Sequence, residues 1–233
     1  MNIEDFATHC ELFETYAERV KSTAFENWHP AAVAAAVNAP YESIRIPAEI
    51  LSDILSSNPN YRQHFDEKRP KSSVELDHDV NIMGGRTYFP KIGPISWKEY
   101  PMLCEIPDKD LNMYLERLTR SITDRMAIIL SAFSMSDTDT YLHLFPYEDF
   151  SNYFEVRFIV VEGRLISGRW INVPEGADVN ADFSRAMSKY AAALVSTCQF
   201  GTVQIDLCAP ADQDQNSIKL LEINPFFTEN ERR

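Results

Sequence analysis

The 233-residue chain contains few of the features that mark several large classes of protein. Its four cysteines, Cys10, Cys104, Cys198 and Cys208, show no C-x-x-C spacing. Because this spacing is absent, the cysteines indicate neither a zinc site nor a disulfide framework, and a reducing cytoplasm is the expected compartment. No apolar run approaches the length of a membrane span, and the start carries no cationic apolar leader. We therefore expect a cytoplasmic protein without a membrane partner.

Positive charge is also scarce. The chain has 22 lysines and arginines against 35 aspartates and glutamates, for a formal net charge of −13. Proteins that bind duplex nucleic acids normally carry a basic surface, so we expect no nucleic-acid partner. An acidic surface still allows a local basic pocket, and nucleotide binding stays open. The hydrophobic fraction of 45% and the aromatic fraction of 12% are typical of a globular domain.

The first half of the chain predicts a mixture of helices and strands. Apolar residues at helical spacing predict a helix over 3–20, and a second amphipathic helix is expected over 107–126 with Asp108 as its N-cap. A strand is expected to end at Lys91 in "TYFPK". The polar, proline-punctuated stretch 57–81 predicts a long loop.

The second half of the chain has a clearer pattern. The runs "MAIILSAF" and "TYLHLFPY" predict short strands, and 154–173 predicts a hairpin that turns at Glu162 and Gly163. A helix is expected over 181–198, followed by two strands joined by the polar "ADQDQN". The order of these elements predicts an α+β fold rather than alternating βαβ units.

The last predicted strand, "KLLEINPFF", carries two polar residues on one face. Alternation places Glu222 and Asn224 on the same side, and Asp206 would lie near them if the last two strands pair as a hairpin. Two carboxylates and an amide form a set of oxygen ligands that suits Mg²⁺. The alternative is a solvated polar face on an edge strand.

Two cations precede this acidic set in the chain. Lys91 ends its strand, and Arg157 shares a strand face with Glu155. Phosphoryl groups need fixed cations, for which arginine offers bidentate hydrogen bonding and lysine a point charge. Each residue alone is typical of a solvated charge at a strand edge. Their combination with the acidic set favours a nucleotide site.

Four short motifs resemble, in their order and spacing, the cell division cycle protein 123 family of the ATP-grasp superfold. The resemblance covers about residues 85–227 and extends more weakly to "FENW" and "IRIPAEILSDIL". The motifs are "YFPKIGPISW", "EVRFIVVEGRLISG", "QIDL" and "LLEINPFF".

The resemblance implies an ATP-grasp-like α+β fold with two lobes and a nucleotide cleft between them. Residues 1–139 would form a helical and mixed lobe that carries the phosphate lysine. Residues 140–233 would form the C-terminal ATP-grasp lobe, built on a mainly antiparallel sheet with the metal-binding strands.

The resemblance also implies the ligands of ATP and Mg²⁺. Lys91 and Arg157 would contact the phosphates, while Asp206, Glu222 and Asn224 would hold Mg²⁺. Glu222 stands where the family usually has aspartate, but glutamate is common in other ATP-grasp proteins.

The predicted adenine site departs further from the family. Phe145, Pro146 and Tyr147 replace the family's L-R-K-W-like hinge run, so the hinge arginine is missing. Leu142 and Leu144 are the expected adenine contacts. In a separate strand, Arg169 is a candidate second phosphate cation.

Two functions follow from the resemblance. In the family, the ATP-bound protein is an assembly chaperone for eukaryotic translation initiation factor two, which implies a protein partner of that kind and no bond-forming reaction. The wider superfold contains ligases that join a carboxylate to an amine or thiol through an acyl phosphate. Few further cations are available beyond Arg164 and Arg169, which favours binding over ligation. Whether the chain is an enzyme stays open.

Two further interpretations concern residues outside these motifs. The stretch 57–80 is expected to become ordered with nucleotide or partner, and the alternative is a passive surface loop. A structural role is favoured for His143 over a nucleotide contact. The sequence shows no nucleophile and base side by side except Cys10 and His9, which point in different directions on a helix.

Overall fold

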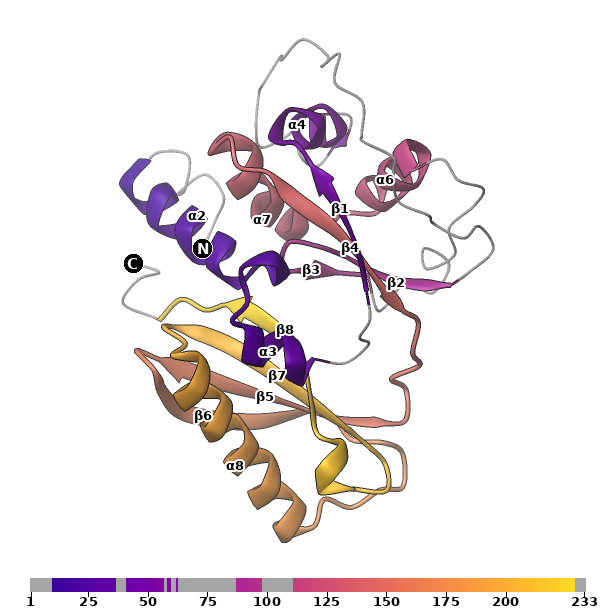
Figure 1. Ribbon diagram of the computed structural model, residues 1–233, viewed down its shortest axis with the longest axis vertical. Coiled ribbons are helices and arrows are strands. Elements are labelled where there is room, and N and C mark those ends of the chain that lie inside the picture. The colour runs from indigo at the N-terminus through magenta and orange to yellow at the C-terminus, as the bar shows by residue number, and fades with distance from the viewer. Residues whose placement is uncertain are drawn as a thin grey trace. The chain divides into compact units, whose positions relative to one another are not determined.

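The computed structural model describes residues 10–36, 41–56, 58–59, 62, 87–97 and 111–228 (Figure 1). The chain forms two compact units. The first unit contains Met1–Glu26 and Pro40–Tyr147, and the second contains Asn27–Ala39 and Glu148–Arg233. Each unit has a four-stranded sheet, and the strands of both sheets pair only in the antiparallel sense. The predicted α+β class is therefore confirmed.

The sheet of the first unit has the strand order β1-β4-β2-β3. Its strands are β1 (Glu42–Ile46), β2 (Tyr88–Ile92), β3 (Ile95–Ser96) and β4 (Thr140–Pro146). Ile44, Leu142 and Ile92 lie opposite one another on three adjacent strands and are at most 2% exposed, so they are core residues on one face of the sheet. The residues that alternate with them, including Lys91 and His143, lie on the other face.

Several helices accompany this sheet (Figure 1). Helix α7 contacts both α2 and α4, and α4 also contacts α6. The helical segments are α2 (Cys10–Thr23), the 3₁₀ turn η1 (Phe25–Asn27), α4 (Ala48–Ser56), α6 (Leu111–Arg120) and α7 (Asp124–Met135). Within the described residues, the helix predicted over 3–20 is confirmed from Cys10 onward. The helix predicted over 107–126 is confirmed over Leu111–Arg120 but ends there, and a separate helix begins at Asp124.

The prediction of a strand at "MAIILSAF" is wrong, because this run lies inside helix α7. The Thr123 side chain accepts a hydrogen bond from the backbone N–H of Met126 at 3.3 Å and so caps the helix. The buried residues Ala127, Leu130 and Ser134 recur at helical spacing. A short apolar run does not distinguish a strand from a buried helix. The capping residue Thr123, which precedes the run, is the signal in the sequence that favours a helix.

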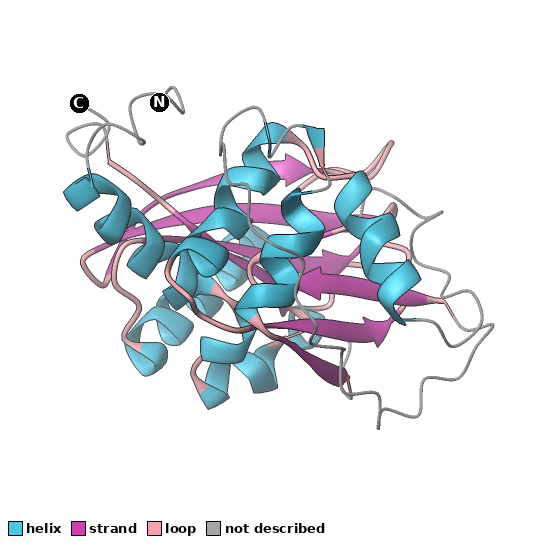
Figure 2. Cartoon of the chain, turned by 90° about the horizontal axis from the view of Figure 1, so that it is seen from above, coloured by secondary structure: helices cyan, strands magenta, loops and turns pink. Residues whose placement is uncertain are grey.

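The second sheet has the strand order β6-β5-β7-β8. The elements of this unit are α3 (Pro30–Ala35), β5 (Tyr153–Val161), β6 (Arg164–Asn172), α8 (Ala181–Cys198), β7 (Val203–Pro210), η3 (Gln215–Ser217) and β8 (Lys219–Pro225). Both predicted hairpins and the helix over 181–198 are confirmed. Figure 2 distinguishes these helices and strands by colour.

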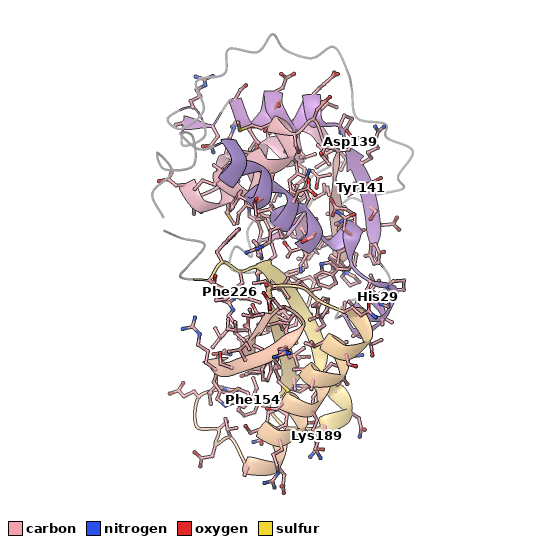
Figure 3. All side chains as sticks on the ribbon, turned by 90° about the vertical axis from the view of Figure 1, so that its left-hand side faces the viewer. His29, Asp139, Tyr141, Phe154, Lys189 and Phe226 are labelled. Atoms are coloured by element: carbon pink, nitrogen blue, oxygen red, sulfur yellow. The ribbon has the colours of Figure 1, made fainter. Side chains whose placement is uncertain are left out.

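Helix α8 covers one face of the second sheet. It contacts β5, β6 and β7, and its Phe183 ring lies 5.3 Å from the ring of Phe154 and 5.9 Å from that of Trp170, centroid to centroid (Figure 3 labels Phe154). Alternate residues of β5, from Phe154 to Val160, are buried on this side. Glu155 and Arg157 consequently lie on the face away from α8.

The turn between β5 and β6 explains why the chain reverses at this point. Glu162 and Gly163 have φ angles of 49° and 74°. A two-residue hairpin turn with both central residues at positive φ matches the twist of the strands that it joins. Glycine takes this conformation without a steric cost, and the hairpin turn predicted at Glu162 and Gly163 is confirmed.

Strand β4 is hydrogen-bonded to β1 and β2 and thus belongs to the sheet of the first unit. The division at residues 139 and 140 stays a prediction. Except for Asn58, Pro59 and Arg62, the predicted loop 57–81 lies outside the described residues, as does the expected cap Asp108. Among the residues that are described, no helix is both long and apolar enough to cross a membrane.

Candidate functional site

A row of charged residues crosses the second sheet on the face away from α8. Arg169 of β6 lies opposite Arg157 of β5, Arg157 lies opposite Asp206 of β7, and Asp206 lies opposite Glu222 of β8. Residues directly opposite in an antiparallel sheet share a face. We call Arg169, Arg157, Asp206 and Glu222 the charged row.

Arg157 and Asp206 form a two-pronged ion pair at the centre of the charged row. The Nε of Arg157 donates to Oδ1 of Asp206 at 2.7 Å, and Nη2 donates to Oδ2 at 2.6 Å. The Asp206 side chain is fully buried, whereas that of Arg157 is 21% exposed. Two parallel hydrogen bonds between ions fix the orientation of both groups.

Asn224 completes the set that the sequence predicted. It lies opposite Gln204, two positions along β7 from Asp206 and so on the same face of the sheet. Its Nδ2 is 3.4 Å from Oδ2 of Asp206 and 3.3 Å from Oε2 of Glu222. The structure therefore brings Asp206, Glu222 and Asn224 together, and their roles as ligands stay predictions.

Burial raises the pKa of Asp206 above its ordinary value of 3.8. The two hydrogen bonds from Arg157 act against this shift, whereas the charges of Glu222 and Glu155 add to it. The pKa of Arg157 is also raised, chiefly by its hydrogen bonds to Asp206, so the guanidinium stays charged. Three carboxyl groups, those of Asp206, Glu222 and Glu155, therefore act on the guanidinium of Arg157.

The donor atoms fit Mg²⁺. Within the described residues, no group of three or more His, Cys, Asp or Glu side chains is placed to hold a metal ion. The third donor of this set would be the amide oxygen of Asn224, beside the carboxylates of Asp206 and Glu222. Such oxygens are the ligands that Mg²⁺ takes, with waters and phosphates completing its coordination. The amide now directs its NH₂ group at both carboxylates, so metal binding requires the amide to turn over.

The remaining predicted nucleotide ligands lie in the first unit. Lys91 is 4% exposed and lies opposite His143 of β4. Leu142 and Leu144 alternate with His143, so they lie on the other face of the sheet, where they are 0% and 1% exposed. The structure does not bring these leucines and Lys91 to one face. Their roles toward ATP stay predictions.

Sequence reasoning missed a second polar cluster, which lies in the first unit. The hydroxyl of Ser43 on β1 is hydrogen-bonded to His143 on β4. The two residues are 100 positions apart in the chain. Only the pairing of β1 with β4 brings them together, and no local spacing indicates it.

Comparison with known proteins gives a likeness of structure. No protein-family model matches the chain, and no curated protein matches its sequence. The chain superposes on Cdc123 from Schizosaccharomyces pombe with a TM-score of 0.58 and 17% identity, over 91% of this chain and 86% of that one. A C-terminally truncated Cdc123 from the same organism gives a TM-score of 0.54 with the same identity and coverage. The chain has the Cdc123 fold.

This result confirms the predicted resemblance at the level of the fold. The match extends over 91% of the chain, which is more than the region 85–227 that carries the motifs. At a sequence identity of 17%, the likeness shows a common fold and nothing about function. Function must be argued from the residues of the site.

Proposed function

We propose that this chain binds ATP with Mg²⁺ and that its ATP-bound form binds a protein partner as an assembly factor. The observation that carries the proposal is the meeting of Arg157, Asp206, Glu222 and Asn224 on one sheet face. The likeness to Cdc123 supports it, because the sequence motifs that indicated the resemblance contain these same residues.

The two arginines of the charged row are the proposed phosphate contacts in the second unit. Arg157 uses its Nε and Nη2 to bind Asp206, which leaves N–H groups of the guanidinium for other acceptors. Arg169 lies next to it and is exposed. Asp206 thus orients one cation while the other stays accessible to an anion.

Asp206, Glu222 and Asn224 are the proposed holders of Mg²⁺. When bound, the metal would neutralise phosphate oxygens beside these carboxylates. Lys91 is proposed as a further phosphate contact, and Leu142 and Leu144 as adenine contacts, on the resemblance alone.

Binding of a protein partner is proposed as the outcome of nucleotide binding. The resemblance implies translation initiation factor two, or a related factor, as that partner. A ligase needs more cations near the reacting phosphate. On the described face of the second sheet, Arg157 is already paired with Asp206. This pairing favours stable nucleotide binding over ligation.

Isothermal titration with ATP, with and without Mg²⁺, tests nucleotide binding. The intact chain should bind ATP in a Mg²⁺-dependent manner, and Asp206→Asn should weaken binding at least tenfold. Glu175→Gln removes the same charge from an exposed turn outside the charged row and should leave the affinity unchanged. Absence of Mg²⁺-dependent binding in the unmodified chain would end the proposal.

A second experiment separates an assembly factor from a ligase. Release of ADP and phosphate is measured with a panel of carboxylates, amines and thiols, beside a pull-down for stoichiometric protein partners. A stable partner complex without turnover supports the assembly role. Turnover that depends on one acceptor overturns it in favour of ligation.

A further inference from the structure

A chain of hydrogen bonds crosses the first unit from an exposed hydroxyl to a buried one. The Oγ of Ser43 lies 2.6 Å from Nδ1 of His143, and Nε2 of His143 lies 3.1 Å from Oε2 of Glu26. The hydroxyl of Thr140 donates to the other oxygen of Glu26 at 2.7 Å. A hydroxyl, an imidazole and a carboxylate in this order are the parts of an activated nucleophile.

The chemistry of Glu26 determines the direction of these hydrogen bonds. An ionised carboxylate only accepts, so the ring nitrogen that faces Oε2 must carry a proton. In the neutral imidazole, Nδ1 is then an acceptor, and the hydroxyl of Ser43 donates to it. The tautomer that follows from this network is the one in which His143 can take the serine proton.

The environment of the three groups differs along the chain of hydrogen bonds. The side chains of His143 and Glu26 are 3% and 12% exposed, whereas Ser43 is exposed. The imidazole is in contact with aromatic rings, which lower the local dielectric and strengthen its hydrogen bonds. These rings are Phe25, Tyr41, Phe145 and Tyr141, the last of which is labelled in Figure 3.

The backbone holds the nucleophile and the base in place. Ser43 and His143 are partners in the pairing of β1 with β4, and His143 is also the partner of Lys91 on β2. The three residues thus form a row on one face of the sheet, with Lys91 and His143 buried and Ser43 exposed on the edge strand. A site built on paired strands is more rigid than one built on loops.

We propose that Ser43 is a nucleophile toward carboxylic esters, with His143 as its general base and Glu26 as the residue that positions the base. The distance of 2.6 Å between Ser43 and His143 is within the range for a nucleophile and its base. A buried histidine that served only stability would also need hydrogen-bond partners, but it would not need a partner hydroxyl that is open to solvent.

The reaction uses no group beyond the ester and water. The Oγ of Ser43 attacks the carbonyl carbon while its proton passes to Nδ1 of His143, and the imidazolium is stabilised by Glu26. The bond between carbonyl carbon and alcohol oxygen then breaks, and the alcohol leaves with the proton from Nδ1. Water then attacks the acyl carbon while Nδ1 takes its proton. The bond between that carbon and the Oγ of Ser43 breaks, Nδ1 returns the proton to Oγ, and the carboxylic acid leaves.

Covalent labelling of the full chain with a fluorophosphonate probe tests this proposal, with the modified residue identified by mass spectrometry. We expect an adduct on Ser43 that is absent in Ser43→Ala. His143→Asn removes the base and should lower the labelling rate by about 100-fold, the usual contribution of a general base. Glu26→Gln keeps the size of the positioning residue and should lower the rate less.

Ser167 provides the matched control, because it is an exposed serine on strand β6. Ser167→Ala should leave labelling unchanged. Ser43 is exposed, so Ser43→Ala should keep its melting temperature, which thermal denaturation verifies. The intact chain should also release p-nitrophenol from p-nitrophenyl acetate in a burst that Ser43→Ala lacks. Labelling of Ser43 no faster than that of Ser167 would overturn the proposal, even if the His143 variant fails to fold.

Discussion

The Ser43–His143–Glu26 cluster of the first sheet and the charged row of the second sheet hold polar groups in different ways. In the second sheet, Arg157 and Asp206 meet as full charges, with Asp206 completely buried. In the first sheet, a histidine joins Ser43 to Glu26 through single hydrogen bonds, and the exposed end is a neutral hydroxyl. Removal of one partner from the charged row should therefore destabilise the fold strongly. The Ser43 cluster, in contrast, ends in a hydroxyl that water can solvate.

This difference has a physical basis in desolvation. An ion that is taken out of water needs a partner, and loss of that partner leaves the whole desolvation cost uncompensated. A neutral hydroxyl at the surface exchanges one hydrogen bond for another with water. The stability of the charged row therefore depends on its ion pair, whereas the exposed end of the Ser43 cluster does not depend on a protein partner.

The largest effect on stability is expected from Arg157→Leu. The substitution leaves the carboxylate of Asp206 buried without its two charged donors. We expect a loss of about 3 kcal/mol in the free energy of unfolding, measured by urea denaturation. The double variant Arg157→Leu with Asp206→Leu should recover most of this loss. If the single variant is as stable as the unmodified chain, the contrast between the two faces fails.

A smaller effect is expected at the buried end of the first-sheet cluster. Thr140 is fully buried and donates to Glu26 at 2.7 Å. Thr140→Val removes this hydrogen bond to a carboxylate and should cost about 1.5 kcal/mol in the same urea experiment. Ser43→Ala, at the exposed end, should stay within about 0.5 kcal/mol of the unmodified chain. An equal loss of unfolding free energy in Thr140→Val and Ser43→Ala would contradict the difference in burial between these two residues.

The smallest effect is a dependence of stability on pH. The pKa of Asp206 is raised in the folded state above its ordinary value of 3.8. The contribution of Asp206 to the stability of the fold is therefore complete below pH 3.8 and is lost as the pH rises through the folded-state pKa. The stability of the unmodified chain relative to Asp206→Asn should fall over this interval. Parallel pH profiles of the two proteins would show that burial does not shift this carboxyl group.

The two regions also differ in how far the sequence predicts them. The charged row lies on strands with regular alternation, and the hairpin between β7 and β8 places Asp206 beside Glu222 as predicted. The register of Arg169 against Arg157 depends on an irregularity in the pairing of β5 with β6, which alternation alone does not give. Alternation along the strands therefore predicts the position of Asp206 beside Glu222, but it does not predict the position of Arg169.

The Ser43 cluster could not be predicted in this way. Its hydrogen bonds join residues 100 and 117 positions apart, on β1, β4 and η1. The chain contains other serines, histidines and glutamates, and only the tertiary structure brings these three together. The same limit explains the error at α7, where packing on neighbouring helices buries an apolar run that resembles a strand.

The central claim is that the charged row binds Mg²⁺ and ATP, and thermal denaturation with and without Mg·ATP tests it most directly. A ligand that binds only the folded chain stabilises it by about 2.7 kcal/mol at a free concentration 100 times its Kd. We predict a clear rise in the melting temperature of the unmodified chain, a similar rise in Glu175→Gln, and little or none in Asp206→Asn. A melting temperature of the unmodified chain that Mg·ATP leaves unchanged, or an equal rise in Asp206→Asn, would contradict the account.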